Sequence, residues 1–193
     1  YSPADVLPGE AISATGECGE ETTWTLYESG KMIVSGKGAI QSYDSFKDTP
    51  WYPMKDLIKS VKIGKDITEV GKNAFAHCYS LNGTITLPST LSVIEKGAFT
   101  NCKNLTTISV DDKNDNYFSV SGVLYDVSLG SLIICPAGKS GTVKVKSGTK
   151  SIADDAFIGC KNVTKVSIPN SVTTIADNAF NGCSDALVIA CKC

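Results

Sequence analysis

The sequence contains one histidine, His77, and has no long apolar run. A Ser-His or Cys-His nucleophile system would have to use this one side chain, which we expect to be a solvated turn residue. No stretch approaches the roughly 18 apolar residues that a membrane-spanning helix needs. The net charge of -2 shows no basic excess. We therefore predict no enzymatic activity, no nucleic-acid binding and no membrane span in this chain.

Metal sites also lack support, although the chain has eight cysteines. Cys191-Lys192-Cys193 lacks a second pair at zinc-finger spacing and a histidine to complete four ligands. The run at 112–116 is similar to the first half of a calcium loop, but Tyr117 stands where that loop needs Gly, and the Glu at its end is missing. Asx-turn chemistry explains this run better. We expect no metal, no cofactor and no catalytic residue.

What the sequence does have is a repeat. The string Ala-Phe-x-x-Cys occurs four times, and its Phe75, Phe99, Phe157 and Phe180 follow one another at intervals of 24, 58 and 23 residues. An aliphatic residue stands five positions before each Phe, and another follows each Cys after three or four positions. A fixed period in this range predicts a solenoid in which the repeated side chains stack inside successive coils.

Short segments with period-two alternation accompany the repeats, and they predict strands with one buried face. Parallel strands require a returning connection on every turn, which each coil supplies. We therefore predict a right-handed solenoid with a parallel sheet of about six strands. These strands are expected near residues 61–63, 85–87, 108–110, 143–145, 166–168 and 187–189.

The interval of 58 residues holds one further coil and an insert. The surplus contains two apolar runs, at 116–125 and 132–136, around a Gly-containing turn. This pattern predicts a β-hairpin inserted into the solenoid at about 116–136.

The N-terminal part predicts a module that covers the first coil. Segments 22–27 and 31–35 flank a turn with Gly, which predicts a hairpin, and a short helix is expected from Pro53 to Ser60. An open solenoid end would expose sheet edges, so we expect a cap with Trp24 and Trp51 in its core. The predicted division is a linker or disordered terminus at 1–15, a β cap module at 16–60 and a solenoid at 61–193.

Together these motifs resemble the BspA-like branch of the leucine-rich repeat proteins. Its unit has an Ile-Gly-x-x-Ala-Phe-x-x-Cys-x-x-Leu character, and its chains often contain an Asn-x-Asn-Tyr-x-x-x-x-Gly-Val-Leu-Tyr insert, which matches residues 114–125. The usual Gly before Ala-Phe survives only as Gly71, with Glu95, Ala153 and Ala176 in the other coils. The resemblance implies a leucine-rich repeat solenoid of the α/β horseshoe class, mostly β with short helical turns.

The resemblance also implies a function. Such a protein would be a non-enzymatic, secreted or cell-surface protein of a bacterium or protist that mediates adhesion or protein–protein interaction. Host matrix proteins, other cells or mucosal glycoproteins are the implied partners. A structural spacer that displays another domain, with no ligand of its own, is the alternative. Tyr1 is not an initiator methionine, so we expect a processed or truncated chain, and we expect a monomer.

The residues that point outward from the predicted strands form a candidate binding face. Solenoids use extended faces for partners, so a protein or glycan ligand is expected here. A solvated face without a partner is the alternative, and the inserted hairpin is a second candidate surface. The candidate residues are Lys62, Thr84, Thr86, Thr107, Ser109, Thr142, Lys144, Lys165 and Ser167.

The repeated cysteines form a column at the corner where each coil turns toward its strand, a place for a small and weakly polar side chain. Bridges between Cys78 and Cys102, or between Cys160 and Cys183, are within reach because successive coils lie about 4.8 Å apart. We predict four buried, reduced thiols instead, because a column in register repeats one side-chain direction. The sequence leaves open the states of Cys18, Cys135, Cys191 and Cys193.

Overall fold

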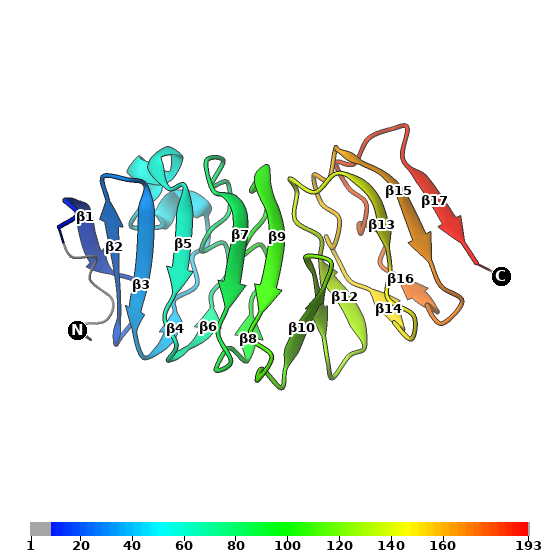
Figure 1. The fold of residues 1–193 in the computed structure, drawn as a ribbon, viewed down its shortest axis with the longest axis horizontal. Coiled ribbons are helices and arrows are strands. Elements are labelled where there is room, and N and C mark those ends of the chain that lie inside the picture. The colour runs from blue at the N-terminus through cyan, green and yellow to red at the C-terminus, as the bar shows by residue number, and fades with distance from the viewer. Residues whose placement is uncertain (1–8, 193) are drawn as a thin grey trace.

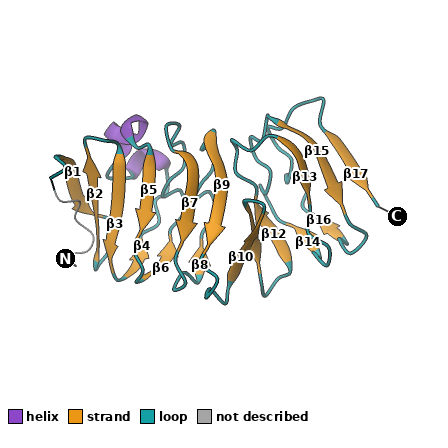
Figure 2. Ribbon diagram, viewed as in Figure 1, coloured by secondary structure: helices purple, strands orange, loops and turns teal. Residues whose placement is uncertain are grey.

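The computed structural model describes residues 9–192 and shows an elongated solenoid, with strands of successive coils side by side along the long axis (Figure 1). Among these residues, helix is confined to two 3-10 segments near the N-terminal end, η2 (Phe46–Asp48) and η3 (Tyr52–Leu57) (Figure 2). Residues 1–8 of the predicted terminal linker, and Cys193, lie outside the described residues. The solenoid predicted from the sequence, mostly β with little helix, is confirmed.

The long strands of the coils, which we call main strands, are parallel, and those predicted before the last one are in the predicted register. Ile85 lies opposite Ile108. Val166 lies opposite both Val143 and Ile189. The repeat therefore places the same inward residue at the same height in each coil. The main strands are β3 (Lys31–Gly36), β5 (Ser60–Ile63), β7 (Asn82–Leu87), β9 (Asn104–Val110), β13 (Gly141–Lys144), β15 (Val163–Ile168) and β17 (Val188–Cys191).

A second set of short strands, which we call minor strands, lies on another side of the coils. Val70 pairs with Ile94, and Ile152 pairs with both Leu132 and Ile175. These are the aliphatic residues that precede the Phe column, but segments this short show no alternation that would predict a strand. The minor strands are β4 (Gly38–Ile40), β6 (Ile67–Val70), β8 (Val93–Ile94), β12 (Ser131–Ile134), β14 (Ser151–Ile152) and β16 (Thr174–Ile175).

The main strands divide into three hydrogen-bonded groups. Among the described residues they pair as β3–β5, β7–β9 and β13–β15–β17. The second break has a visible cause, because backbone of the insert occupies the free edge of β9. The Ile108 N–H donates to the Gly122 carbonyl, and the Gly138 N–H donates to the Leu105 carbonyl, each at 2.9 Å.

The last main strand starts later than the sequence predicts. β17 begins at Val188, and Cys191 lies opposite Ile168, so the inward residues are Ile189 and Cys191. The prediction of 187–189 was two residues early, because Leu187 belongs to the corner before the strand. Its N–H donates to the Ser184 carbonyl, and it packs against the C-terminal core.

The insert begins with an antiparallel hairpin of β10 (Tyr117–Val120) and β11 (Val123–Asp126). β12 then runs antiparallel to β11 and parallel to β14. The turn of the hairpin therefore lies at 121–122, inside the first predicted apolar run. The second run supplies a minor strand and belongs to the solenoid itself. We count the coils from the one that contains Trp51, so Phe75 and Phe99 lie in the second and third coils, and this strand belongs to the fourth.

Asn114 joins the insert to the coil before it. Its side-chain amide donates to the carbonyls of Pro88 and Leu91 at 2.8 and 2.9 Å. Its carbonyl oxygen accepts from the N–H groups of Asn116 and Tyr117. This buried side chain thus satisfies four backbone groups, which accounts for the first Asn of the insert motif.

The N-terminal end differs from the prediction at its first strand. β1 (Ile12–Glu17) pairs antiparallel with β2 (Thr22–Tyr27), and β2 pairs antiparallel with β3. Residues 12–15 are therefore strand and not linker. This edge strand is held by backbone pairing and by a hydrogen bond from the Thr15 hydroxyl to the Trp24 carbonyl at 2.7 Å. Neither interaction needs an apolar pattern in the sequence.

An aromatic column runs through the coils. The Trp51 ring stacks on Phe75 at 5.4 Å, and Phe75 stacks on Phe99 at 5.7 Å. Trp51 is buried, as predicted, and its indole N–H donates to the Ala74 carbonyl at 3.0 Å. Beyond the insert the column resumes with Phe157 on Phe180 at 5.0 Å. The core accordingly consists of two clusters of buried residues.

Cys135 takes the place of a Phe in the fourth coil. Its N–H donates to the Ala156 carbonyl at 2.7 Å, as the Phe157 N–H donates to the Ala179 carbonyl at 2.8 Å. The column residue of this coil is thus too small to stack on either neighbour.

The cysteines of the repeat are free thiols. Three are buried, but Cys183 is half-buried, so the prediction of burial is wrong there. The reason is that no further coil covers it among the described residues. The Cys102 thiol donates to the Phe75 carbonyl at 3.0 Å, and the Cys183 thiol donates to the Phe157 carbonyl at 3.1 Å. Cysteine therefore serves as a small donor that links one coil to the coil before it.

Candidate functional site

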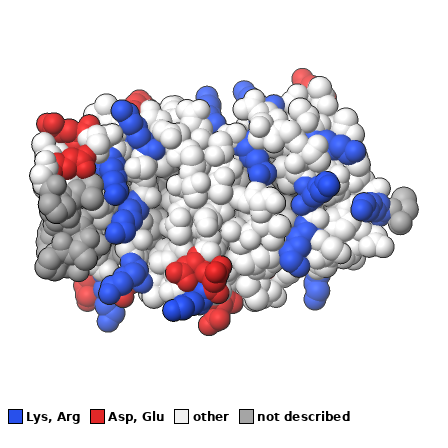
Figure 3. Space-filling view, in the orientation of Figure 1, with Lys and Arg blue, Asp and Glu red and all other residues white. Residues whose placement is uncertain are grey.

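The main strands present an outward face that Figure 3 shows from the front. Positive side chains gather over the strands at both ends, and the middle of the face, over β7 and β9, is almost uncharged except for a group of acidic side chains at the lower ends of these strands. All 18 basic residues of the sequence are lysines. Lysine offers a compact point charge and not the planar fork of arginine, so the face favours charge complementarity over bidentate recognition.

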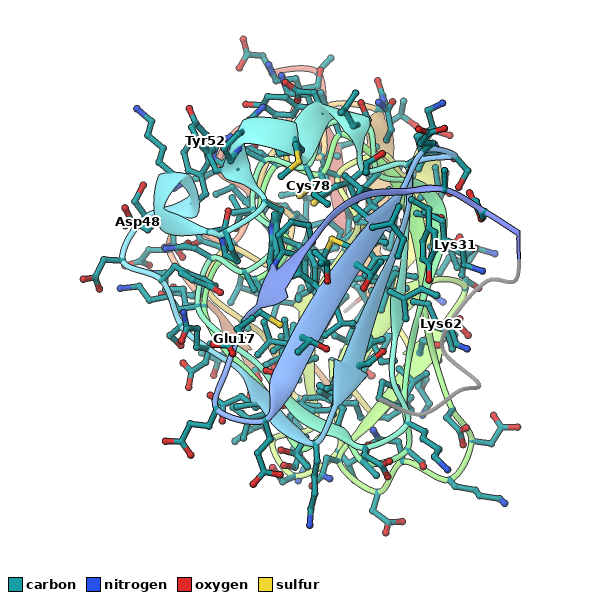
Figure 4. All side chains as sticks on the ribbon, turned by 90° about the vertical axis from the view of Figure 1, so that its left-hand side faces the viewer. Glu17, Lys31, Asp48, Tyr52, Lys62 and Cys78 are labelled. Atoms are coloured by element: carbon teal, nitrogen blue, oxygen red, sulfur yellow. The ribbon has the colours of Figure 1, made fainter. Side chains whose placement is uncertain are left out.

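The N-terminal positive area lies over β3, β5 and the loop that follows. Lys31 and Lys62 lie along the same side of the molecule, away from Asp48 and Tyr52 (Figure 4). They line a shallow groove of about 430 Å³ together with Lys65, Thr84 and Thr86. The groove coincides with the break between β5 and β7. This area brings together three of the candidate residues, namely Lys62, Thr84 and Thr86.

The C-terminal positive area lies over β13 and β15. Thr142 is opposite Lys165, and Lys144 is opposite Ser167, so the two lysines stand diagonally across adjacent strands. Both lysines and Thr142 are exposed, whereas Ser167 is half-buried. This area contains four of the candidate residues.

Hydroxyl groups occupy the middle of the face. Thr84 lies opposite Thr107, and Thr86 lies opposite Ser109, in β7 and β9. Thr107 and Ser109 are half-buried, because the hairpin lies against β9. A Cβ atom at Gly122 would lie only 3.1 Å from the Thr107 methyl group. The structure therefore places the nine candidate residues on one side of the coils but separates β9 from β13 by the insert.

His77 is more constrained than the expected solvated turn residue. Its ring stacks on Phe46 at 4.0 Å, and its Nδ1 lies 2.8 Å from the Tyr79 hydroxyl. Partial burial lowers the pKa of His77, and the nearby Lys55 and Lys103 lower it further. The sequence prediction missed this packing because Phe46 is remote in sequence and belongs to η2.

Tyr79 beside His77 is flanked by two cations. The ammonium groups of Lys55 and Lys103 each lie 4.8 Å from the centre of the Tyr79 ring. Such cation–π contacts hold the corner of the second coil against η3. They give these side chains a packing role.

The acidic run before the insert forms Asx turns. The Asp111 carboxylate accepts from the Lys113 N–H at 2.9 Å, and the Asn114 side chain accepts from the Asn116 N–H at 2.8 Å. Within residues 9–192, no three His, Cys, Asp or Glu side chains converge where they could hold a metal ion. In the same range no helix is long and apolar enough to span a bilayer.

A comparison of the sequence with known protein families agrees with the repeated coils of the structure. The sequence matches the family described as "BspA type Leucine rich repeat region" in six copies, over residues 52–136 and 137–190. No curated protein matches the chain significantly.

Two solved bacterial proteins are similar in structure. One is a leucine rich cell surface protein from Faecalibacterium prausnitzii, with 18% identity and a TM-score of 0.50, covering 89% of this chain and 75% of its own. The other is the pneumococcal vaccine antigen PcpA, with 12% identity and a TM-score of 0.54, covering 92% of this chain and 72% of its own. At these identities the likeness concerns the fold. The family match spans most of the chain, which therefore belongs to the BspA-type leucine-rich repeat family.

Proposed function

We propose that this chain is a non-enzymatic interaction module of the cell surface or secreted space, which binds an anionic protein or glycan through its main-strand face. The observation that carries the proposal is the arrangement of exposed lysines on both sides of a panel of hydroxyl groups. Lys62 lies on one side of the panel, and Lys144 and Lys165 lie on the other. Hydroxyl groups donate and accept hydrogen bonds, which suits sulfate, carboxylate and sugar groups.

Two further observations support this function. The solved proteins with the same fold are described as a cell surface protein and as a vaccine antigen, which favours an extracellular location. The one histidine is engaged in packing with Phe46 and Tyr79. Adhesion to host matrix or cell-surface molecules is the form of interaction that we propose.

A binding experiment with heparin, a sulfated polysaccharide, tests the proposal. Replacing Lys62, Lys144 and Lys165 by Ser should weaken binding about tenfold or more and flatten its salt dependence, because the charges act within a screening length of about 8 Å. A matched variant with Ser at Lys47, Lys72 and Lys113 removes the same charge elsewhere and should bind normally.

The stability of both variants should match that of the parent, because exposed charges contribute little to folding. Equal loss of heparin binding in both variants would refute a specific face. Absence of any heparin binding by the parent, together with no capture of matrix proteins, would instead favour the structural spacer.

A further inference from the structure

The turn of the fourth coil is shorter than the turns on either side. Ile152 precedes the column residue Phe157 by five positions, and the same spacing holds in the other coils with the Phe motif. Leu132 pairs with Ile152, yet it precedes Cys135 by only three positions. The surface therefore dips over the fourth coil, between the longer turns of the third and fifth coils.

This dip forms a cavity of about 300 Å³, which we call the notch. It lies beside the minor strands β8, β12 and β14, away from the outward face of the main strands. Its apolar lining comes from all three coils. This lining includes Ile94, Phe99, Tyr117, Ile133, Ile134 and Ala153.

The notch reaches down to the aromatic column because Cys135 is too small to fill the space that a Phe occupies in the neighbouring coils. Phe99 ends the first stack, and Phe157 begins the second. Leu129 stands at the rim with 65% of its surface exposed. Leu129 and the apolar lining of the notch together present apolar surface to solvent.

The rim carries mostly negative charge. Glu95, Asp126, Asp154 and Asp155 line the notch, against Lys96 alone. The Lys96 ammonium lies 3.8 Å from the Asp155 carboxylate and 4.0 Å from that of Asp154. Lys96 and Asp154 are largely exposed, so this contact is weak and a competing cation can displace it.

We propose that the notch binds an aromatic side chain of a partner peptide whose neighbouring residues are lysine or arginine. Its volume lies at the lower end of the range for ligand sites, about 300–1,000 Å³, which suits one anchoring side chain. Aromatic anchors in desolvated pockets dominate many interfaces. The carboxylates of the rim complement flanking cations and repel flanking anions.

The notch goes beyond the proposed function, because the main-strand lysines attract anions whereas the notch selects a cationic segment. A protein partner could engage both surfaces, with an acidic region on the main strands and a basic aromatic segment in the notch. The two surfaces are nevertheless independent in the test.

The probe is the capped tripeptide Lys-Trp-Lys, titrated into the full chain and followed by amide chemical shifts. We expect shifts confined to segments 94–100, 133–137 and 153–158 and to Tyr117, Asp126 and Leu129. The capped peptides Glu-Trp-Glu and Lys-Ala-Lys should each bind at least about tenfold more weakly, because one lacks the complementary charge and the other lacks the anchor. Equal binding of all three peptides, or no shifts at about 5 mM Lys-Trp-Lys, would overturn the proposal.

Two variants locate the site. Ala153→Phe should fill the notch and abolish the shifts, and the aligned Glu95 indicates that this position accepts a larger side chain. Ala176→Phe makes the same change at the paired position of the next coil, outside the notch, and should leave binding intact.

Charge removal gives a second readout if Ala153→Phe fails to fold. Asp154→Asn with Asp155→Asn should weaken Lys-Trp-Lys binding about threefold to tenfold, because two nearby charges are lost. Asn tolerates the positive φ of 54° at position 155. Asp177→Asn, outside the notch, is the control. Unchanged affinity of the double variant for Lys-Trp-Lys would refute the charge argument. The variant with Ser at Lys62, Lys144 and Lys165 should still bind the peptide, because these lysines lie outside the notch.

Discussion

The coils before the insert and the coils after it share one repeat but differ in how their aromatic columns end. Before the insert, Trp51 closes the column, and Phe75 has an aromatic ring on both sides. After the insert, Phe157 and Phe180 form a stack of two, and Phe180 is only half-buried. The same residue in the same repeat therefore has different surroundings at the two ends.

The difference extends to the strands. In the last coil, the inward Ile189 is 44% exposed, whereas the inward Ile85 and Ile108 in the earlier coils are fully buried. In a solenoid each coil contacts only its neighbours, so stability is a sum of local terms and interfaces. A coil with one interface should be less stable than a coil with two.

The largest expected effect comes from truncating the column. Phe75→Ala should destabilise the protein by about 3–5 kcal/mol, because it removes a buried ring that stacks on both neighbours. Phe180→Ala is the matched change in the last coil and should cost about 1–2 kcal/mol, because less apolar area is lost. Urea denaturation of both variants measures the difference. Equal costs would contradict the idea that position in the stack determines the value of the ring.

Part of the structure on which this comparison depends could be predicted from the repeat. The inward strand residues and the Phe column follow from period and alternation, and the pairing of Ile85 with Ile108 is the predicted one. The position of Cys135 in the column could not be predicted from the sequence, because a cysteine does not resemble the Phe that it replaces. Its backbone bond to Ala156 and the bond from the Cys160 thiol to the Cys135 carbonyl identify its position.

The second largest effect concerns the joint between the two regions. Asn114→Ala removes four hydrogen bonds made by a buried side chain, so we expect a loss of about 2–4 kcal/mol. Asn116→Ala is the control, because that side chain is exposed and makes one long contact of 3.5 Å with the Leu91 carbonyl.

The same variant tests whether the insert couples the two cores. If it does, the parent should unfold in one transition and Asn114→Ala in two, with tryptophan fluorescence reporting the N-terminal region through Trp24 and Trp51. Coincident transitions by fluorescence and circular dichroism in the variant would mean that coupling runs through other contacts.

The candidate face was predictable only in its outline. Alternation identifies which side chains of β7 and β9 point outward, but the insert that separates β9 from β13 acts through backbone contacts at Gly122 and Gly138. Contacts of this kind leave no side-chain signal. The notch depends on a difference in turn length, which can be counted in the sequence once Leu132 is known to pair with Ile152.

The smallest expected effect is a difference between the two regions in the reactivity of their thiols, not in their stability. Burial raises the pKa of Cys78 to about 12 and that of Cys102 well above its ordinary value of 9.0, whereas the less buried Cys183 rises to about 11. A raised pKa lowers the fraction of thiolate, which is the reactive form, and burial blocks access to it. We expect iodoacetamide to label Cys191 first, Cys183 more slowly, and the two thiols before the insert only after unfolding.

Mass spectrometry of native and denatured samples measures this order. The denatured chain, in which every thiol is accessible, is the control. If Cys102 were labelled as fast as Cys183 in the native protein, the earlier coils would open as readily as the last one. The column of thiol-to-carbonyl bonds, such as that from Cys102 to Phe75, would then not hold those coils together more firmly than the last.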